Sequence, residues 1–437
     1  MNILIKNAVI LTMDDDNPLI RGDIGIADSK ISFVGKCETF TPDRTVDVKG
    51  NIVMPGLVNA HTHSPMTLLR CYADDLALQS WLFDKIFPIE DTLTEDDIYW
   101  GSCLGCLEMI SGGTTSFADM YFLNKGTAKA AVESGMRANI SRSLQCFKEK
   151  PSYENDRMIC EALDLYTEYN GAAEGRIQVE LAPHAVYTNI PAYLRYTANL
   201  AEQLGAGVHT HISENMTENS DCMSKYGMTP TALFKSCGFF KTRTIAAHSV
   251  FLSDEDIRIY KEYNISIAHN PTSNLKLASG IAPIMRYAGS GINIALGTDG
   301  AASNNNLNMF EEIHLAALLQ KGVTNNPEAV SAYTALKMAT VNGAKALGLC
   351  ETGVLKAGYN ADLIVINTDK PHLTPYYDPF SAVAYSAQAS DVESVMVGGR
   401  FLMERGVYST LDVVKIYHNV KRIKGGIENA ACSGKDV

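Results

Sequence analysis

The segment Met54-Pro-Gly-Leu-Val-Asn-Ala-His-Thr-His63 is the stretch that decides the fold of this 437-residue chain. An apolar run that begins at Ile52 passes a Pro-Gly bend and then presents two histidine side chains. Residues two apart in a strand point the same way, so His61 and His63 share one face. Two imidazoles on one face make a natural metal pair, although this spacing alone fits hydrogen-bonded surface histidines equally well.

More apolar runs follow this one, and helical patterns separate them. Eight strand–helix repeats indicate a parallel sheet, and eight strands are the number that closes into a barrel. An open doubly wound sheet is the alternative. Such a sheet usually has a glycine-rich phosphate loop after its first strand, and His61-Thr-His63 stands at that place here. We therefore predict an α/β fold with a TIM-like (β/α)8 barrel in residues 55–354. The predicted strands are Ile52–His63, Thr114–Asp119, Arg137–Ser143, Ile177–Ala185, Gly207–Glu214, Thr242–Ser249, Ile265–Pro271 and Ile292–Gly300.

Both ends of the chain have the patterns of antiparallel strands. Residues 1–54 include a stretch from Asp23 to Val34 in which apolar and polar residues alternate. The C-terminal part contains the apolar run Ala361–Ile366 and a hairpin turn at Val397-Gly-Gly-Arg400. We predict that residues 1–54 and 355–437 together form one small β-sandwich domain with a helical tail.

Composition and charge exclude several classes of protein. The net charge is −12 and there is no basic stripe, which argues against a nucleic-acid partner. No apolar stretch approaches the ~20 residues that span a bilayer, and the N-terminus lacks the pattern of a signal peptide. We therefore expect a cytoplasmic protein without a membrane partner that acts on a small molecule. The stretch from Asp412 to Glu428 packs either on its own barrel or on a neighbouring subunit. The second arrangement would make the protein a homo-oligomer.

Ten cysteines are scattered along the chain, and without export we expect their thiols to be reduced. Cys103 and Cys106 form a Cys-x-x-Cys motif, which can indicate a zinc or redox site. Apolar residues surround both, and no second Cys/His pair follows at zinc-site spacing. We therefore predict two core residues one turn apart on a helix that begins at a Thr94/Asp97 capping box and stops at Gly112.

Polar residues gather at the ends of the predicted strands, which in a barrel is the active-site face. We favour His211 as a metal ligand, with His209 pointing deeper into the barrel, over the alternative that both only pack. Glu214 lies three residues past His211, where a carboxylate can act as base and then as acid. The full set is His61, His63, Asp119, His184, His211, Glu214, His248, His269 and Asp299.

Asp299 and His248 each have two interpretations. Asp299 ends the eighth run in Gly297-Thr-Asp-Gly300, where an acidic residue is either a hard metal ligand or a turn former. Its position in the eightfold order favours the ligand. His248 ends the sixth run, where it either polarises a water molecule or is a hydrogen-bonded core histidine, and its position favours the first.

These segments resemble the amidohydrolase superfamily and, within it, the methylthioadenosine/S-adenosylhomocysteine deaminases. The resemblance runs in order through nearly the whole chain, from residue 1 to about 410, and its motifs are specific. The matching segments are Pro55-Gly-Leu-Val-Asn-Ala-His-Thr-His63, Leu69-Arg-Cys-Tyr-Ala-Asp-Asp-Leu76, Gly112-Gly-Thr-Thr115, Ala182-Pro-His184, His209-Thr-His-Ile-Ser-Glu214, Ala246-Ala-His248, His269-Asn-Pro-Thr-Ser-Asn-Leu-Lys-Leu-Ala-Ser-Gly280 and Gly297-Thr-Asp-Gly-Ala-Ala-Ser303.

The resemblance implies a metal site and a proton carrier. His61, His63, His211 and Asp299 are similar to the four ligands of one divalent metal, with Zn2+ ahead of Fe2+, Mn2+ and Ni2+. Glu214 resembles the proton shuttle, and Asp299 assists it. Some superfamily members bridge two metals through a carbamylated lysine at the end of strand four, but here that run has no lysine, so we expect one metal.

The resemblance also implies substrate contacts. His248 is similar to the residue that hydrogen-bonds the attacking water. Glu90 resembles a carboxylate that binds the ribose diol, and His184 resembles a histidine that contacts the purine or the ribose. Arg142 and Arg157 fall where relatives hold the amino-acid tail of S-adenosylhomocysteine.

The chain departs from the family pattern at two positions near these motifs. Cys71 stands where glycine is common, and Asn215 stands where threonine is common. Neither change removes a chemical group, but both alter the shape of the pocket that we expect.

The function implied by the resemblance is hydrolytic deamination, in which an aminohydrolase cleaves a C–N bond of a cyclic amidine. The adenine ring of S-adenosylhomocysteine, methylthioadenosine or an adenosine-type nucleoside would become hypoxanthine, with release of ammonia. The rival function keeps the scaffold and acts on a guanine, pterin, cytosine or s-triazine ring, or removes chlorine. Glu90 favours a nucleoside, since a carboxylate suits a diol. A non-catalytic barrel scaffold is a remote alternative, because every expected group is present.

Overall fold

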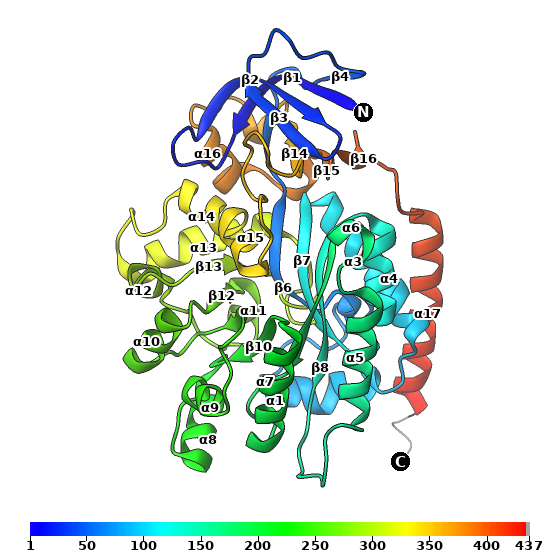
Figure 1. Cartoon of the computed structure of the whole chain (residues 1–437), viewed down its shortest axis with the longest axis vertical. Helices are drawn as coiled ribbons and strands as arrows, with labels where there is room; N and C mark the ends of the chain where they lie inside the picture. Colours follow the sequence, from blue (N-terminus) through cyan, green and yellow to red (C-terminus); the bar gives the residue numbers. More distant parts are fainter. Residues whose placement is uncertain (434–437) are drawn as a thin grey trace.

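A barrel of eight parallel strands forms the centre of the molecule (Figure 1). The computed structural model describes residues 1–433, with side chains as far as Glu428. Strand order follows the chain, and the barrel closes where the Asp299 N–H donates to the His61 carbonyl over 3.0 Å. The predicted (β/α)8 barrel is thus confirmed. Its strands are β6 (Leu57–Thr62), β7 (Thr114–Tyr121), β8 (Arg137–Leu144), β9 (Ile177–Pro183), β10 (Val208–Ile212), β11 (Thr244–His248), β12 (Ser266–His269) and β13 (Ile294–Leu296).

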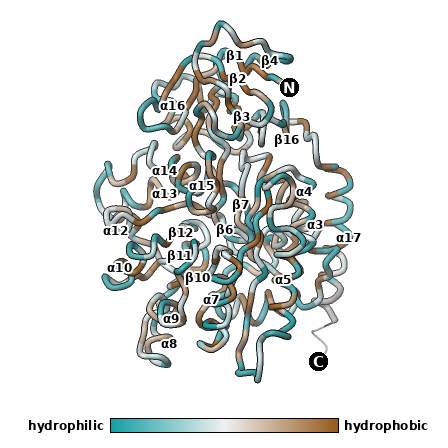
Figure 2. The backbone as a smooth tube through the Cα atoms, viewed as in Figure 1, coloured by the Kyte–Doolittle hydropathy of each residue, from teal (hydrophilic) through white to brown (hydrophobic). Residues whose placement is uncertain are grey.

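Helices cover the outside of the barrel. In Figure 2 hydrophobic stretches follow strands such as β1, and the outer helices alternate between hydrophilic and hydrophobic residues, as one buried face requires. The helices are α1 (Leu78–Ser80), α2 (Phe87–Glu90), α3 (Glu95–Ser111), α4 (Lys125–Ser134), α5 (Arg157–Tyr169), α6 (Ala172–Gly175), α7 (Pro191–Leu204), α8 (Met216–Tyr226), α9 (Pro230–Ser236), α10 (Asp254–Glu262), α11 (Pro271–Lys276), α12 (Ile284–Gly289), α13 (Met309–Thr324), α14 (Ala332–Met338), α15 (Val341–Leu347), α16 (Pro379–Ser381) and α17 (Val413–Ser433).

A second, mixed sheet is built from both termini, as predicted. Strand β5 joins its two halves, because it pairs with β1 on one side and with β14 on the other. The segment before β14 also bonds to β3, where the Ile31 and Ala361 amides donate to Tyr359 and Ser29 carbonyls, each over 2.9 Å. The two ends of the sheet therefore enclose one hydrophobic cluster. The domain boundaries at residues 54/55 and 354/355 stay a prediction. The strands are β1 (Asn2–Leu11), β2 (Leu19–Ala27), β3 (Lys30–Gly35), β4 (Arg44–Asp47), β5 (Ile52–Pro55), β14 (Leu363–Ile366), β15 (Val392–Val397), β16 (Arg400–Glu404) and β17 (Val407–Tyr408).

The predicted first barrel strand, Ile52–His63, is two strands in two different sheets. The chain leaves β5, turns at Gly56 and enters the barrel as β6. A Cβ atom at Gly56 would lie 2.1 Å from the Thr115 methyl carbon, so only glycine fits at this crossing. Only Gly56 separates β5 from β6. The mixed sheet therefore lies at the end of the barrel where the barrel strands begin.

The features expected of α3 and of the tail are also observed. Thr94 and Asp97 form the capping box of α3, Gly112 ends it, and Cys103 and Cys106 are buried in it. Burial raises the pKa of the Cys103 thiol to about 12. Cys432 lies beyond the described side chains.

Helix α17 packs along α3 of the same chain, the first of the two arrangements left open by the sequence (Figure 1). Three isoleucines one to two turns apart, Ile416, Ile423 and Ile427, are buried in a cluster that also contains Trp100. Among the helices of residues 1–433, none combines the length and apolar character needed to cross a membrane.

Asp362 ties the mixed sheet to the barrel, because its buried carboxylate accepts from Arg137 at the start of β8. The contacts are 2.6 Å from Arg137 Nε and 3.1 Å from Nη2, and the Gly398 amide donates over 2.7 Å. Replacing Asp362 with Ala leaves the guanidinium half of a buried pair, so we expect a loss of about 3–5 kcal/mol in unfolding free energy. Urea unfolding followed by circular dichroism measures it.

The matched control is Glu262→Ala, which breaks an exposed pair with Lys235 and is expected to cost less than about 1 kcal/mol. Equal losses in the two variants would show that the Asp362 contact does not couple the sheet to the barrel.

Candidate active site

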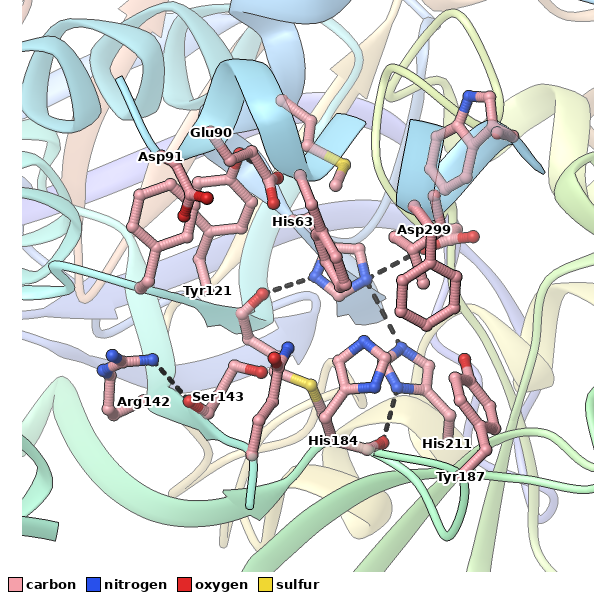
Figure 3. A pocket seen from close by; sticks show the side chains of 18 of the residues that line it. His63, Glu90, Asp91, Tyr121, Arg142, Ser143, His184, Tyr187, His211 and Asp299 are labelled. Atoms are coloured by element: carbon pink, nitrogen blue, oxygen red, sulfur yellow. Dashed lines mark hydrogen bonds and ion pairs between the residues drawn. The ribbon is translucent and has the colours of Figure 1, made fainter. Parts of the chain in front are cut away.

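A cavity of about 490 Å³ opens at the carboxyl ends of the barrel strands. Polar side chains line its floor and one wall, as Figure 3 shows for His63, Glu90, His184, His211 and Asp299. The segment between β6 and α3 supplies an apolar wall, from residues that include Trp81, Leu82, Phe83 and Phe87. A cavity with an apolar wall and converging polar groups is the form of a small-molecule site.

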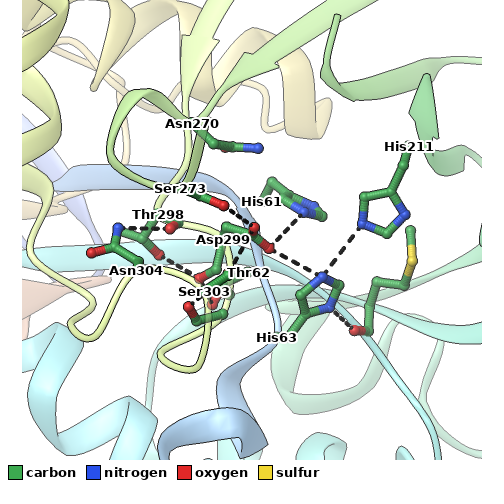
Figure 4. A network of polar contacts seen from close by, with 12 residues as sticks. His61, Thr62, His63, His211, Asn270, Ser273, Thr298, Asp299, Ser303 and Asn304 are labelled. Atoms are coloured by element: carbon green, nitrogen blue, oxygen red, sulfur yellow. Dashed lines mark hydrogen bonds and ion pairs between the residues drawn. The ribbon is translucent and has the colours of Figure 1, made fainter. Parts of the chain in front are cut away.

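Four side-chain atoms meet on the floor of the cavity (Figure 4). The Asp299 carboxylate atom Oδ1 lies 3.3 Å from His61 Nε2 and 3.2 Å from His63 Nε2. His211 Nε2 lies 3.4 Å from His63 Nε2. The structure thus brings together all four residues that the sequence singled out as metal ligands.

The second nitrogen of each of these rings is already engaged. His61 Nδ1 lies 2.8 Å from His209 Nε2, the His63 Nδ1–H donates to the Met120 carbonyl, and the His211 Nδ1–H donates to the His184 carbonyl over 2.7 Å. These contacts fix each ring so that Nε2 faces the common point, which is how histidine ligands are held in metal sites. His209 lies beneath His61, deeper in the barrel, as expected from the sequence.

The donor set fits a divalent metal. His61 Nε2 is fully buried and has no hydrogen-bond partner, which is costly unless another group completes it. His61, His63 and His211 place their ligand atoms within 4.8 Å of one another. His61, His248 and Asp299 form a second such group, so His248 is also within reach. Three imidazoles with one carboxylate are a ligand set that zinc accepts.

The buried Asp299 carboxylate is stable only with a positive charge beside it. Burial alone would raise the pKa of Asp299, but the His61 and His63 rings beside its carboxylate hold that pKa well below its usual range. Burial would lower the pKa of His63, yet Asp299 raises it to about 9. Burial lowers the pKa of His61 to about 4. The buried carboxylate therefore requires positive charge beside it, from a proton on His63 or from a metal.

Asp299 is held by two hydroxyl groups as well. Its Oδ2 atom accepts from Ser273 over 2.6 Å and from Ser303 over 2.8 Å. Its φ angle is +62°, so the residue is also part of a tight turn before Gly300. The two interpretations of this Asp-Gly pair, ligand and turn former, are compatible.

Glu214 and His248 lie beside this cluster of three histidines and Asp299. Glu214 Oε1 is 4.0 Å from His248 Nε2, and His248 Nδ1 is 2.8 Å from Asn274 Oδ1. Burial raises the pKa of Glu214 above its ordinary value, which suits a group that must both take up and release a proton. Asn274 orients the His248 ring so that Nε2 faces Glu214.

Glu90 and His184 line the same cavity. The Tyr121 hydroxyl donates to Glu90 Oε1, and Glu90 Oε2 is left for another partner. Burial raises the pKa of Glu90 to about 7, against the lowering effect of Tyr121. His184 Nδ1 lies 3.2 Å from Thr188 Oγ1, and burial lowers the pKa of His184 to about 3, so the ring is neutral.

The two predicted arginines share one carboxylate. Arg142 is buried in the cavity wall, and its Nε donates to Glu161 Oε2 over 2.7 Å. Arg157 lines the rim with its side chain 79% exposed, and its Nε lies 3.5 Å from Glu161 Oε1. The structure therefore places both arginines at one end of the cavity, with Glu161 between them.

Some strand-end residues do not reach the cavity. Asp119 accepts from the Ser64 amide over 2.6 Å, and His269 is buried with neither ring nitrogen bonded. Conversely, sequence reasoning missed Trp81, Tyr121 and Tyr187, which line the cavity. Aromatic residues outside a motif carry no local sign of their orientation, so no signal in the sequence singled these out.

Asp299 is the residue whose loss should most clearly empty a metal site. We expect Asp299→Asn, purified with added zinc, to retain less than a tenth of the wild-type metal, because it removes the only anionic ligand. Metal analysis by mass spectrometry measures this. Glu214→Gln is the control and should keep its metal. A full metal content in Asp299→Asn would contradict the ligand assignment.

Comparison with known proteins agrees with this geometry. The model of the amidohydrolase family matches residues 52–402. A 5-methylthioadenosine/S-adenosylhomocysteine deaminase from Acetivibrio thermocellus is 48% identical, over 97% of this chain and 99% of its own. A 5′-deoxyadenosine deaminase from Methanosarcina mazei is 46% identical, over 96% and 97%.

Solved structures agree as well. A zinc-bound adenosine deaminase from Xanthomonas campestris superimposes with a TM-score of 0.92 at 33% identity, over 98% of each chain. Similarity of this extent, together with the His/Asp cluster, shows the family. The chain belongs to the amidohydrolase family and, within it, to the 5-methylthioadenosine/S-adenosylhomocysteine deaminases.

Proposed function

We propose that this protein hydrolyses the exocyclic amine of the adenine ring in nucleosides such as S-adenosylhomocysteine, methylthioadenosine, 5′-deoxyadenosine and adenosine. Water enters, ammonia leaves, and the ring becomes hypoxanthine. The observation that carries the proposal is one cavity that holds both the His/Asp cluster with Glu214 and, on its wall, the Glu90 carboxylate. The names of the relatives support the same reaction.

We propose that His61, His63, His211 and Asp299 hold one divalent metal, and that this metal is Zn2+. The zinc in the structural relative supports this choice, and strand β9 has no lysine that would bridge a second ion. When bound, such an ion supplies a Lewis acid that makes water acidic enough to attack near neutral pH.

Glu214 moves the proton. It takes one proton from the attacking water and delivers it to the ring nitrogen next to the carbon that carries the amine. Protonation makes that carbon a better electrophile. The remaining hydroxyl proton of the tetrahedral intermediate then passes through Glu214 to the amine, which leaves as ammonia while the C=O bond forms. A carboxylate whose pKa is raised by burial suits both steps, since it must hold the proton between them.

His248 and Asp299 orient the water. The hydrogen bond between His248 Nδ1 and Asn274 Oδ1 keeps His248 Nε2 turned toward Glu214, where it contacts the same water molecule. Asp299, fixed by Ser273 and Ser303, supplies a carboxylate near the same water molecule. Preorganised groups of this kind need no rearrangement as charge develops.

Other groups bind the rest of the substrate. The free oxygen of Glu90 accepts from a ribose hydroxyl, and neutral His184 contacts the purine or the sugar. Arg142 and Arg157, at the end of the cavity, take the carboxylate of an amino-acid tail when the substrate has one. The apolar wall at Trp81 and Leu82 covers the rings and excludes bulk water.

Replacing Glu214 with Gln tests the proton transfer. We expect at least about a thousandfold loss of kcat, because Gln retains the shape but cannot accept the proton. Ammonia release from methylthioadenosine measures it, with metal content as the control for an intact site. Wild-type turnover in this variant would refute the role of Glu214.

A substrate panel tests the choice of ring. The wild-type protein should release ammonia fastest from S-adenosylhomocysteine, methylthioadenosine, 5′-deoxyadenosine or adenosine, and slowly from free adenine, guanine, cytosine, a pterin or an s-triazine. Glu90→Gln should raise KM for a nucleoside about tenfold or more and leave KM for its 2′,3′-dideoxy analogue almost unchanged, since only the first has the diol. Preference for a free base would contradict the nucleoside assignment.

A further inference from the structure

Glu214 lies in a short turn between β10 and α8 that has no regular structure of its own. Ser213, immediately before it, has a φ angle of +53°, a left-handed conformation that costs about 1 kcal/mol for a residue with a side chain. Helix α8 begins only after Asn215. The position of the Glu214 carboxylate therefore depends on contacts that hold this turn in place.

Glu218 supplies one of these contacts. Its Oε2 atom accepts from the backbone N–H of Glu214 over 2.7 Å. In return, the Asn215 side chain accepts from the Glu218 N–H over 2.9 Å. Glu218 is 3% exposed, and its other oxygen, Oε1, has no hydrogen-bond partner. The bond to Glu214 is thus the main polar contact of a buried carboxyl group.

Two other helices show what this arrangement usually does. In the capping boxes of α3 and α10, the third helical residue is an aspartate whose carboxylate binds the amide of the N-cap residue itself. The distances are 2.9 Å from Thr94 N to Asp97 and 2.9 Å from Ser253 N to Asp256. Glu218 occupies the same helical position but has one methylene more, and it reaches past the N-cap to the preceding amide.

The other side of the turn is held by a neighbouring strand end. The Ser213 carbonyl accepts from the amides of Val250, over 2.9 Å, and Phe251, over 3.2 Å. This segment follows His248 directly, so the turn that carries Glu214 is fixed against the residue that faces it. Glu218 therefore holds the turn from the α8 side, and Val250 and Phe251 hold it from the other side.

We propose, on the basis of the deaminase function given above, that Glu218 is a positioning residue that fixes the backbone of Glu214 so that its carboxylate reaches both the water and the ring nitrogen. The role needs a hydrogen-bond acceptor at this distance and no charge, because the carbonyl oxygen of a protonated acid or of an amide accepts equally well. A displacement of about 1 Å at a reacting group is enough to slow a reaction up to a hundredfold.

Two substitutions separate this role from helix stability. Glu218→Asp shortens the side chain to the length found in the α3 and α10 boxes, so it still caps α8 through Asn215 but releases Glu214. We expect at least about a tenfold loss of kcat for methylthioadenosine, with KM within twofold and the melting temperature nearly unchanged. Glu218→Gln keeps the length and the acceptor oxygen, and should lose less than about threefold.

Asp97→Glu is the matched control, because it changes the side-chain length at the equivalent position of another helix, in the capping box of α3. It should alter neither kcat nor stability. Wild-type kcat in Glu218→Asp would overturn the inference. So would an equal loss in Glu218→Gln, since the charge and not the acceptor would then matter.

A crystal structure of Glu218→Asp gives a readout independent of turnover. We expect the Glu214 amide to have lost its side-chain acceptor and the Glu214 carboxylate to have shifted or to occupy several positions. A Glu214 side chain unchanged from wild type would overturn the inference. If the wild-type protein released no ammonia from any nucleoside, the proposed function would be wrong, and this structural comparison would still decide the role of Glu218.

Discussion

The rest of the site depends on one electrostatic constraint, the burial of the Asp299 carboxylate among three imidazole rings. A carboxylate in such a place is stable only beside positive charge. His61 and His63 turn their Nε2 atoms toward it, and His211 Nε2 lies 3.4 Å from His63 Nε2. Each ring is locked from behind by a carbonyl or by another histidine. The barrel strands bring these groups from distant parts of the chain to one point, and the same geometry that demands a cation also leaves Glu214 and His248 facing the cavity above it.

Much of this arrangement could be predicted from the sequence, since strand ends in a closed parallel barrel share one face. The eight apolar runs predict His61, His63, His211 and Asp299 on one face of the barrel, and the structure places them close together. The predicted role of Glu214 rests on its position three residues after His211, and the structure places its carboxylate in the same cavity, 4.0 Å from His248 Nε2. The resemblance to a family added Glu90, which no periodicity indicates, and it added a substrate contact for His184, which the pattern had already placed at a strand end.

The remainder needed three-dimensional information. The run Ile52–His63 was predicted as one strand because its apolar residues are continuous, and nothing local shows that Gly56 passes it from one sheet to another. Tyr121 and the hydroxyl groups of Ser273 and Ser303 support the site from segments whose distance to it is set by the fold alone. The sequence also gave no sign that Glu161 would lie between Arg142 and Arg157.

The mixed sheet has a consequence for the way the chain assembles. Strands β1, β2 and β3 are synthesised first, but β5 finds its second neighbour, β14, only when Ile366 can pair with Ile52. Until then one edge of a hydrophobic sheet stays open on the nascent chain, next to the strand that starts the barrel. Contacts so far apart in sequence form slowly. An unpaired apolar edge during that interval favours aggregation, so we expect folding in the cell to depend on protection of the N-terminal strands until synthesis is complete.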